Sequence, residues 1–387
     1  MIFGQKVNFE YPEEGYFYSH FSLDLRSLSL FRVFLGLVVI GDQVKNIVTL
    51  FSQQNFPDQY YHWSILHLFS DPCTQLALKL LTIISALFLI LGFHTRFFCF
   101  SSWLLLILSN LNSHELDKVV FSTLELLLFW SIFLPTGARF SIDEARLRRL
   151  EHLNIGVFSP VSCALLIQIS YAFWIEWFFL GTSDLTGFLS ITFASLSLII
   201  PCLLFLPIMR EWIRILVIIA MVIIALGTEQ IIFNDFDTMA RLFSWSILIP
   251  GRTWDWAKGK LRTEARMGLK IFYDGQCSFC QKLCLILKSF FLIRETPVVS
   301  ADEYTSVQQD MEIRNSWVVI DYTQKRFYEA EALVVVVANS PILFPLSWLI
   351  SIKPVLWLLT KGYRLVANNR SRFSLITRFI HFENSQN

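Results

Sequence analysis

Long apolar runs separated by short polar stretches fill the first 250 residues of the chain. Several of them approach the length of about 17 to 25 residues that an α-helix needs to cross a bilayer. The runs are residues 28–50, 75–93, 97–111, 119–135, 157–180, 188–207, 213–226 and 239–250. This pattern predicts an α-helical polytopic membrane domain of about eight helices. The third and eighth runs are short for a span.

A different pattern begins at residue 269, where short apolar stretches alternate with amphipathic ones. It predicts, in order, a strand at 269–273, a helix at 277–291, a strand at 297–301, a helix at 302–312, a hairpin of 316–322 and 325–328, and a helix at 329–339. We therefore expect a small α/β domain that begins with a strand–helix–strand unit.

The tail of the chain combines apolar, aromatic and basic residues. Residues 341–359 are apolar and include Trp348 and Trp357, and the basic stretch 364–378 follows them. Tryptophan and basic side chains are favoured at the surface of a bilayer. We expect this tail to lie on the membrane surface, and a ninth span is the alternative.

Composition and charge support a membrane protein. Of 387 residues, 54% are hydrophobic and 16% are charged, and the mean hydropathy is +0.52. Soluble domains carry about 25% charged residues. Lys and Arg gather before the first run, in alternate loops and in the stretch 252–270, whereas the intervening loops together contain only Lys118. Since basic loops stay in the cytoplasm, this alternation predicts a multi-pass protein with both termini cytoplasmic.

Several other function classes are disfavoured by the sequence. It contains no phosphate-binding loop, no Gly-rich dinucleotide fingerprint and no nucleophile elbow. The basic stretch 252–270 directly follows a predicted span, so we expect it to meet anionic lipid and not nucleic acid. Residues 1–27 lack the apolar core of a cleavable signal peptide.

Two cysteines lie where the first strand of the predicted α/β domain meets its first helix, in the segment YDGQCSFC. Asp274 and Gly275 favour a sharp turn there. The turn places Cys277 at the start of the helix, where the dipole and the unpaired N–H groups lower the thiol pKa from about 8.5. Cys280 follows one turn later. The arrangement is thioredoxin-like and predicts thiol–disulfide exchange, with Cys277 as the nucleophile and Cys280 as the resolving thiol.

Asp274 has two possible roles in this motif. It caps the turn before the helix, or it accepts a proton during exchange. Inert core thiols and zinc are the alternatives to redox chemistry, because one Cys-x-x-Cys is half of a tetrahedral site. The second half is missing: Cys284 lies one turn beyond Cys280, and His381 is near the C-terminus. We expect no metal and no cofactor, and we expect simple packing for Cys73, Cys99, Cys163 and Cys202.

Three segments of the C-terminal region resemble the DCC family of thiol–disulfide oxidoreductases, small thioredoxin-like proteins named for an Asp-x-x-Cys-x-x-Cys core. The segments are YDGQCSFC, SWVVIDYTQKRFYEAEAL and GYRLVANNRSRF, and they occur in the family's order and spacing. Asp274, Cys277 and Cys280 match the core. The resemblance covers about the last third of the chain. It implies reduction or exchange of protein disulfides, with a thiol or disulfide protein as the partner.

The membrane region resembles a second family, the HTTM domain related to vitamin K-dependent γ-carboxylase. The resemblance rests on SLSLFRVFLG, LGFHTRF and FLPTGARFSI and covers most of residues 20–255. It divides the chain into an HTTM-like domain (1–255), a basic linker (256–268) and a DCC-type domain (269–387). His114 and Lys118 are candidates for a carboxylase base, but no lumenal glutamyl-binding domain follows, so carboxylation is disfavoured.

Ionisable residues inside predicted spans are costly, so each is a candidate for function. They are Asp42, Lys45, Glu125 and Glu176. The first two are three residues apart and can form an ion pair. Glu176 lies between two tryptophans, where it either reaches the membrane interface or lines a small-molecule pocket, with His62, Trp63 and His67 at its mouth.

These residues predict an alternative function. The protein would be a membrane enzyme or carrier for a lipid, quinone or small molecule, and the thiol domain would be a regulatory attachment. A relay of electrons between the thiols and a membrane quinone is a third possibility. The favoured prediction remains a membrane-bound thiol–disulfide oxidoreductase that works in the cytoplasm, where thiol pools favour reduction.

Overall fold

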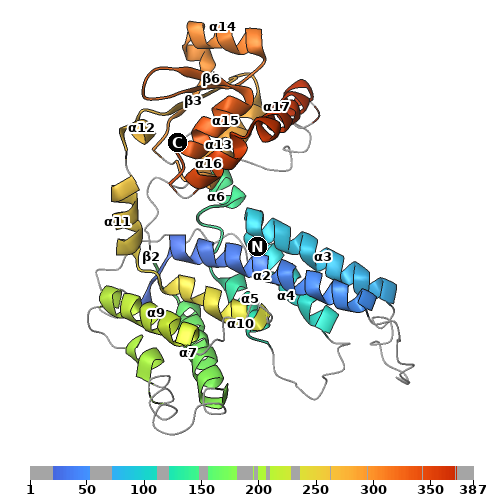
Figure 1. Cartoon of the computed structure of the whole chain (residues 1–387), viewed down its shortest axis with the longest axis vertical. Coiled ribbons are helices and arrows are strands. Elements are labelled where there is room, and N and C mark those ends of the chain that lie inside the picture. The colour runs from blue at the N-terminus through green and yellow to red at the C-terminus, as the bar shows by residue number, and fades with distance from the viewer. Residues whose placement is uncertain are drawn as a thin grey trace, which may run out of the picture. The chain divides into compact units, whose positions relative to one another are not determined.

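A computed structural model (Figure 1) describes residues 21–52, 72–110, 122–147, 156–180, 195, 199–205, 210–227, 236–261, 263–293, 295–341, 343–370 and 372. Its contacts divide the chain into two compact units. The N-terminal unit consists of Met1–Ala138 and Leu153–Thr253, and the C-terminal unit of Arg139–His152 and Trp254–Asn387. The predicted boundaries at residues 255 and 269 stay a prediction.

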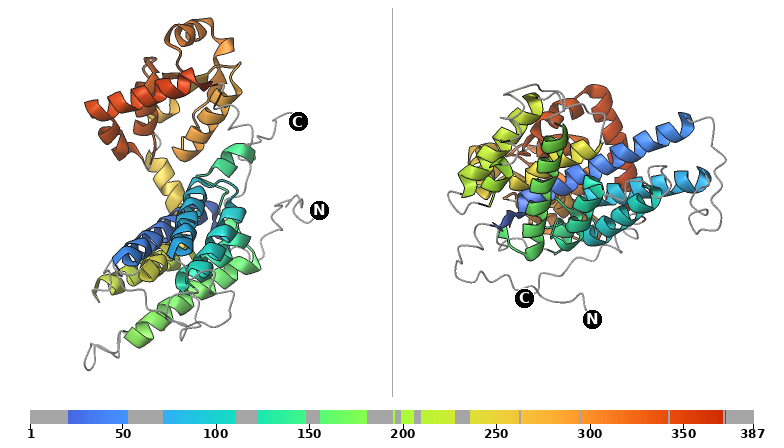
Figure 2. Two further views of the ribbon diagram at one scale, coloured as in Figure 1. Left: turned by 90° about the vertical axis from the view of Figure 1, so that its right-hand side faces the viewer. Right: turned by 90° about the horizontal axis from the view of Figure 1, so that it is seen from below.

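The N-terminal unit is helical. Its elements are α2 (Leu25–Ser52), α3 (Pro72–Leu91), α4 (Thr95–Asn110), α5 (Thr123–Phe133), α7 (Pro160–Leu180), α9 (Arg210–Gly227), α10 (Phe236–Ser244), the 3₁₀ turn η3 (Trp245–Leu248), and the paired strands β1 (Leu23–Asp24) and β2 (Gly156–Val157). Helices α2, α3 and α4 lie side by side in sequence order (Figure 2). Their buried faces meet in one apolar core that includes Phe31, Leu89 and Leu127.

Two of the described helices, Leu25–Ser52 and Cys73–Leu91, are long and apolar enough to cross a membrane. Thr123–Phe133 and Pro160–Trp174 are apolar but shorter. Length and composition alone do not separate a span from the core helix of a soluble protein or, near the N-terminus, from a signal sequence. The predicted eight helices, the multi-pass topology and the cytoplasmic termini are therefore not confirmed.

Glu125, one of the ionisable candidates, caps a helix. Its carboxylate accepts hydrogen bonds from the backbone N–H of Ser122 (3.1 Å) and from the side chain of Asn110 (2.9 Å). The Ser122 hydroxyl accepts from the Glu125 N–H in return, which completes a capping box at the start of α5. Glu125 thus stabilises the helix start, which explains its presence without a ligand.

The other membrane-region predictions have mixed outcomes. The Asp42 carboxylate accepts hydrogen bonds from Gln43 and Asn46, and its ion pair with Lys45 stays a prediction. Cys99 is buried in the core as expected, whereas Cys73 and Cys202 are exposed. Glu176 belongs to α7, but its side chain lies outside the described part of the structure. Also outside the described residues are His62, Trp63, His67, His114, Lys118 and His381.

A small mixed sheet organises the C-terminal unit. Its strands are β3 (Lys270–Tyr273), β4 (Val298–Ser300), β5 (Val318–Ile320) and β6 (Arg326–Tyr328), in the order β4-β3-β5-β6. Strand β3 runs parallel to β4 and antiparallel to β5, and β5 pairs with β6 as a hairpin. Helix α13 (Ser278–Phe290) makes the crossover between the parallel strands. The predicted strand–helix–strand unit and hairpin are both present.

Helices and alternating strand residues build a core on each face of this sheet. The helical elements are α6 (Ile142–Leu147), α11 (Gly251–Leu261), α12 (Glu264–Met267), the 3₁₀ turn η4 (Ala301–Glu303), α14 (Thr305–Arg314), α15 (Glu329–Ala338), α16 (Phe344–Ile350) and α17 (Lys353–Asn368). Ile271 belongs to the core with α13 and α15, and its neighbour Phe272 to the core with α14. This alternation follows from the two-residue period of a strand.

Helix α6 belongs to the C-terminal unit although it precedes α7 in the sequence. Its Glu144 accepts a hydrogen bond from the Ser289 hydroxyl of α13 (2.5 Å) and lies 3.5 Å from the Arg139 guanidinium. All three side chains are buried. Helix α13, which carries the cysteine motif, is thereby held on its far end by a segment from the first half of the chain.

Candidate functional site

The turn between β3 and α13 positions the cysteine motif. Asp274 accepts a hydrogen bond from the Gln276 N–H through its carboxylate (3.0 Å), and from the Cys277 N–H through its backbone carbonyl (3.0 Å). A Cβ at Gly275 would overlap the Asp302 carboxylate, so a side chain there would require its neighbours to move. The turn therefore ends the strand abruptly and delivers Cys277 to the start of α13.

Cys277 and Cys280 form a disulfide at this helix start. Cys277 is the N-cap of α13, its Sγ accepts a hydrogen bond from the Cys280 N–H (3.2 Å), and the two Cα atoms are 5.2 Å apart. Both residues are partly exposed. When the bond is reduced, the same N–H and the positive end of the helix dipole favour a thiolate on Cys277. The geometry thus suits reversible exchange.

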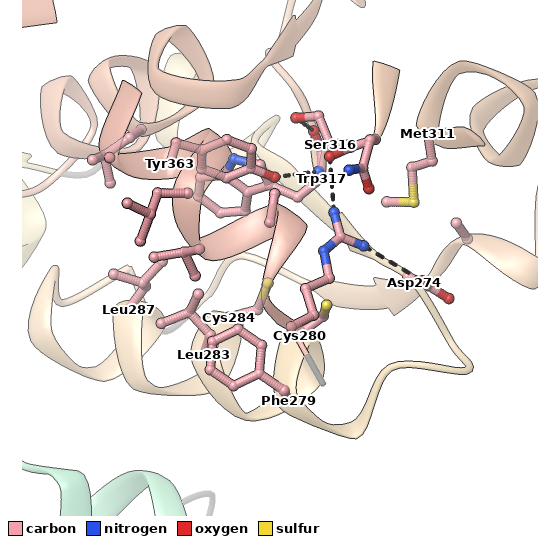
Figure 3. Close-up of a pocket in the computed structure, with 18 of the residues that line it drawn as sticks. Asp274, Phe279, Cys280, Leu283, Cys284, Leu287, Met311, Ser316, Trp317 and Tyr363 are labelled. Atoms are coloured by element: carbon pink, nitrogen blue, oxygen red, sulfur yellow. Dashed lines mark hydrogen bonds and ion pairs between the residues drawn. The ribbon is translucent and has the colours of Figure 1, made fainter. Parts of the chain in front are cut away.

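An arginine from the C-terminal end of the unit lies beside the turn. Arg370 Nη1 is 3.6 Å from Asp274 Oδ2, and the same guanidinium donates a hydrogen bond to the Asn315 carbonyl (2.9 Å) (Figure 3). The Asp274 side chain is 41% exposed. Asp274 therefore links three features: the turn, the start of α13 and the residues after α17.

A cavity of about 1010 Å³ lies beside the cysteine pair. Figure 3 shows Phe279, Leu283 and Leu287 of α13 along one side of it, with Tyr363 and Trp317 opposite. Helix α17 supplies further apolar side chains, and polar side chains lie near Cys280 and at the rim. The polar lining residues are Asp274, Gln276, Asp302, Gln308, Glu312, Asn315, Ser316, Lys361 and Arg370. The cavity offers an apolar ligand or side chain a place within reach of the disulfide.

Tyr363 fixes α17 at this cavity. Its hydroxyl accepts a hydrogen bond from the Trp317 N–H (3.0 Å), at the point where β5 begins. The Trp317 indole donates to the Glu329 carbonyl (3.0 Å), and Arg364 of α17 donates to the Glu329 carboxylate (3.1 Å). Burial raises the pKa of Tyr363 above its usual value, so the phenol stays neutral at physiological pH.

Cys284 lies one turn beyond Cys280 and also lines the cavity. Burial raises the pKa of this thiol to about 12, so it stays protonated near neutral pH. A neutral buried thiol is a poor nucleophile, so Cys284 is less suited to exchange than the pair at the helix start. Among the residues that the structure describes, no group of three or more His, Cys, Asp or Glu is placed to hold a metal ion.

Comparison with known families gives an independent result for the same region. Residues 271–375 match the DCC1-like thiol-disulfide oxidoreductase family. The DCC resemblance of the C-terminal part is thereby confirmed, whereas the HTTM resemblance is not shown. No curated protein and no solved structure matches the chain. The DCC1-like region contains the turn, both cysteines, the cavity and α17.

The sequence motif located the cysteines but not the walls of the site. Tyr363 and Arg370 had no predicted role, although both belong to the segment GYRLVANNRSRF that carries part of the family resemblance. Trp317 likewise belongs to one of the segments that resemble the family, SWVVIDYTQKRFYEAEAL. These segments were the available signal. The structure adds that they converge on Asp274 and on the cavity beside Cys280.

Proposed function

We propose that this protein is a membrane-bound thiol–disulfide oxidoreductase that reduces or exchanges disulfides of a protein partner. One observation carries the proposal: the Cys277–Cys280 disulfide lies at the start of α13 and beside an open, largely apolar cavity. The family match supports the reaction class. The bilayer, a multi-pass topology and cytoplasmic termini are part of the proposal and rest on the apolar runs and the loop charges.

The reaction proceeds in two exchanges. In the reduced protein the Cys277 thiolate attacks one sulfur of a substrate disulfide, and the other substrate sulfur leaves as a thiolate that takes up a proton. The Cys280 thiol then loses its proton and attacks Cys277 Sγ. The Cys277–Cys280 bond forms, the mixed disulfide breaks, and the second substrate thiol is released. Two electrons pass from the dithiol to the substrate, and a cellular thiol pool restores the dithiol.

Asp274 acts in this scheme as a positioning residue. Its two hydrogen bonds hold the backbone that presents Cys277, and its carboxylate lies beside Arg370. A substitution that keeps the shape, Asp274→Asn, therefore leaves exchange largely intact if capping is its role. If Asp274 accepts the proton of Cys280, the same variant slows the second exchange and accumulates mixed disulfide.

The lining of the cavity supports a proposal for the kind of partner. Its apolar walls are formed by Phe279, Leu283 and Leu287 on one side and by residues of α17 on the other. A disulfide carried next to an apolar segment would place that segment in the cavity and its sulfur near the cysteine pair. We propose such a protein as the substrate. A quinone or lipid in the same cavity is the competing occupant.

The test is a redox titration of the full chain in membranes. Alkylation-shift analysis across a glutathione series should give a reversible two-electron transition that Cys277→Ser abolishes and Cys73→Ser, outside the unit, leaves unchanged. Cys280→Ser should trap a mixed disulfide with the partner. If the pair does not oxidise reversibly, the proposal fails, and the alternative of a membrane enzyme or carrier is then tested with Glu176→Gln.

A further inference from the structure

Helices α16 and α17 expose more large apolar side chains than their neighbours do. The exposed set, which we call the α16–α17 face, consists of Phe344, Leu346, Trp348, Leu349, Ile352, Trp357, Leu358 and Leu365, with exposed fractions of 38 to 77%. Eight such residues within one short segment form a concentration that a soluble surface rarely carries. A concentration of this kind marks a site of interaction with a membrane or with another protein.

The opposite side of α17 is firmly docked. Ala367 is buried, and the Tyr363 hydroxyl accepts a hydrogen bond from the Trp317 N–H within the C-terminal unit. Arg364 is held by the Glu329 carboxylate. The exposed apolar side chains of α17 therefore do not arise from an undocked helix, because its inner side is fixed. Helix α16, which carries most of the others, contacts both α15 and α17.

The charge of residues 341–370 bears on which partner the α16–α17 face binds. Residues 341–370 contain four basic residues, Lys353, Lys361, Arg364 and Arg370, and no Asp or Glu. Lys353 and Lys361 are exposed, and the Lys361 ammonium lies 3.8 Å from the centroid of the Trp357 ring. Tryptophan, leucine and lysine side by side, without acidic residues, is the composition of a helix that lies in the interface of an anionic bilayer.

We infer that the α16–α17 face binds the surface of an anionic bilayer, with its tryptophans and leucines among the headgroups and its lysines against the lipid phosphates. The inference concerns a binding surface and does not depend on the thiol chemistry. It does have a consequence for that chemistry. Leu358 and Leu365 of the face also line the cavity beside Cys280, so the cavity would open towards lipid.

The experiment places a photo-crosslinker on the face of the full chain, reconstituted into nanodiscs of phosphatidylcholine with or without phosphatidylglycerol. A benzophenone-bearing phenylalanine replaces Trp348 in one variant and Ile313 of α14 in the matched control. Ile313 is 83% exposed and belongs to the same unit, but acidic Asp310 and Glu312 accompany it. Irradiation with acyl-tagged lipids should give a lipid adduct at position 348 and none at position 313.

Charge substitutions supply the second readout. Lys353→Gln and Lys361→Gln should each lower the lipid adduct at position 348 about fivefold in anionic nanodiscs, the value expected for the loss of one basic residue at such a surface. Neither lysine holds the fold together, and protection of Cys284 from alkylation verifies folding in each variant. Equal adducts in anionic and neutral nanodiscs would overturn the role assigned to charge.

Other occupants of the face give distinct products. An adduct between position 348 and the N-terminal unit of the same chain, or with a second copy, would overturn the inference, as would the absence of any lipid adduct. The redox titration of the cysteine pair is measured on the same samples. A failed lipid adduct with an intact titration thus leaves the proposed function standing.

Discussion

The hydroxyl of Tyr363 accepts a hydrogen bond from the backbone N–H of Trp317 across 46 residues of sequence. The bond joins α17 to the start of β5, the strand next to the one that leads into the cysteine motif. Helix α17 thereby becomes a wall of the cavity instead of a loose C-terminal tail. The stability of the site depends on this contact.

Tyr363→Phe should destabilise the C-terminal unit by about 1–3 kcal/mol, because it leaves the partly buried Trp317 N–H without its acceptor. The measurement is a urea titration of the full chain in which alkylation of Cys284, read by peptide mass spectrometry, reports unfolding of this unit. Tyr322→Phe is the control, since Tyr322 is 55% exposed in the β5–β6 turn. Equal midpoints for the two variants would contradict the importance of the bond.

Two cysteines of the C-terminal unit, Cys277 and Cys284, should differ sharply in reactivity. After reduction at pH 7.5, we expect rapid alkylation of Cys277, because the start of α13 stabilises its thiolate. Cys284 should stay unmodified, because burial raises its pKa to about 12. A time course of iodoacetamide labelling resolved by peptide mapping tests the order. If Cys284 in the folded chain were labelled as fast as Cys277, the contrast between a reactive Cys277 and a buried, protonated Cys284 would be wrong.

Gly275→Ala should impair disulfide exchange, since the added Cβ would overlap the Asp302 carboxylate and the Ser300 hydroxyl. The Asp302 and Ser300 side chains, or the turn itself, must shift to relieve the overlap, and a shift of the turn would move Cys277 with it. Gly259→Ala is the matched control: Gly259 lies in helix α11 and has no atom within 4 Å of the added group. That control should raise helix stability by about 0.5–1 kcal/mol and keep full exchange activity.

Asp310 makes part of the stability of the unit dependent on pH. The hydrogen bond from Arg326, with a second from Tyr328, holds the pKa of Asp310 below its usual value. A lowered carboxyl pKa contributes stability that is fully present above the unfolded value of about 3.9 and is lost as the pH falls through the folded value. Asp310→Asn should therefore reduce stability at pH 7 and flatten its loss in acid.

Urea midpoints at pH 7 and pH 3 test this expectation. Each sample is incubated in urea at its own pH and then neutralised briefly, and Cys284 is alkylated during that short interval. Gln308→Ala, two residues earlier in α14 and without a charge, serves as the control and should keep the slope of the parent chain. A variant at position 310 with the same acid sensitivity as the parent would show that the pair with Arg326 contributes nothing.

Glu144→Gln should cost about 3–5 kcal/mol, because it leaves the buried Arg139 guanidinium without its carboxylate. The Ser289 hydroxyl would also lose a charged acceptor on α13. Asp143→Asn provides a neighbouring control, since the pair of Asp143 with Arg146 is partly exposed and should contribute at most about 1 kcal/mol. Hydrogen exchange in α13 measures both. A similar small effect in the two variants would refute the special role of Glu144.

The elements of the DCC1-like region were predictable from local sequence. The expected strand at 269–273 is β3, and the expected hairpin around Thr323 and Gln324 is β5–β6. Turn chemistry explains this success, because Asp-Gly and the polar pair between apolar strands define where the chain reverses. The expected helix at 302–312 is less regular, since a 3₁₀ turn precedes α14 and the helix extends to Arg314.

The walls of the site could not be read from the sequence. Trp317 and Tyr363 meet only because α17 packs against α15 and reaches the start of β5, and no local pattern fixes such a long-range contact. The capping role of Glu125 was different. Its signal was present as Ser122 three residues earlier, but the apolar surroundings favoured its interpretation as an intramembrane charge. The apolar runs predicted about eight spans. Two of the described helices are long and apolar enough to cross a membrane, and the other spans stay a prediction.

Helix α6 has a consequence for how the two units are joined. Since residues 139–152 belong to the C-terminal unit, the chain passes between the units three times, after Ala138, after His152 and after Thr253. A protease that cuts within α11 would sever the last of these connections alone. The fragment carrying the disulfide would then remain attached through Ser289 and Glu144, and denaturant would be needed to release it.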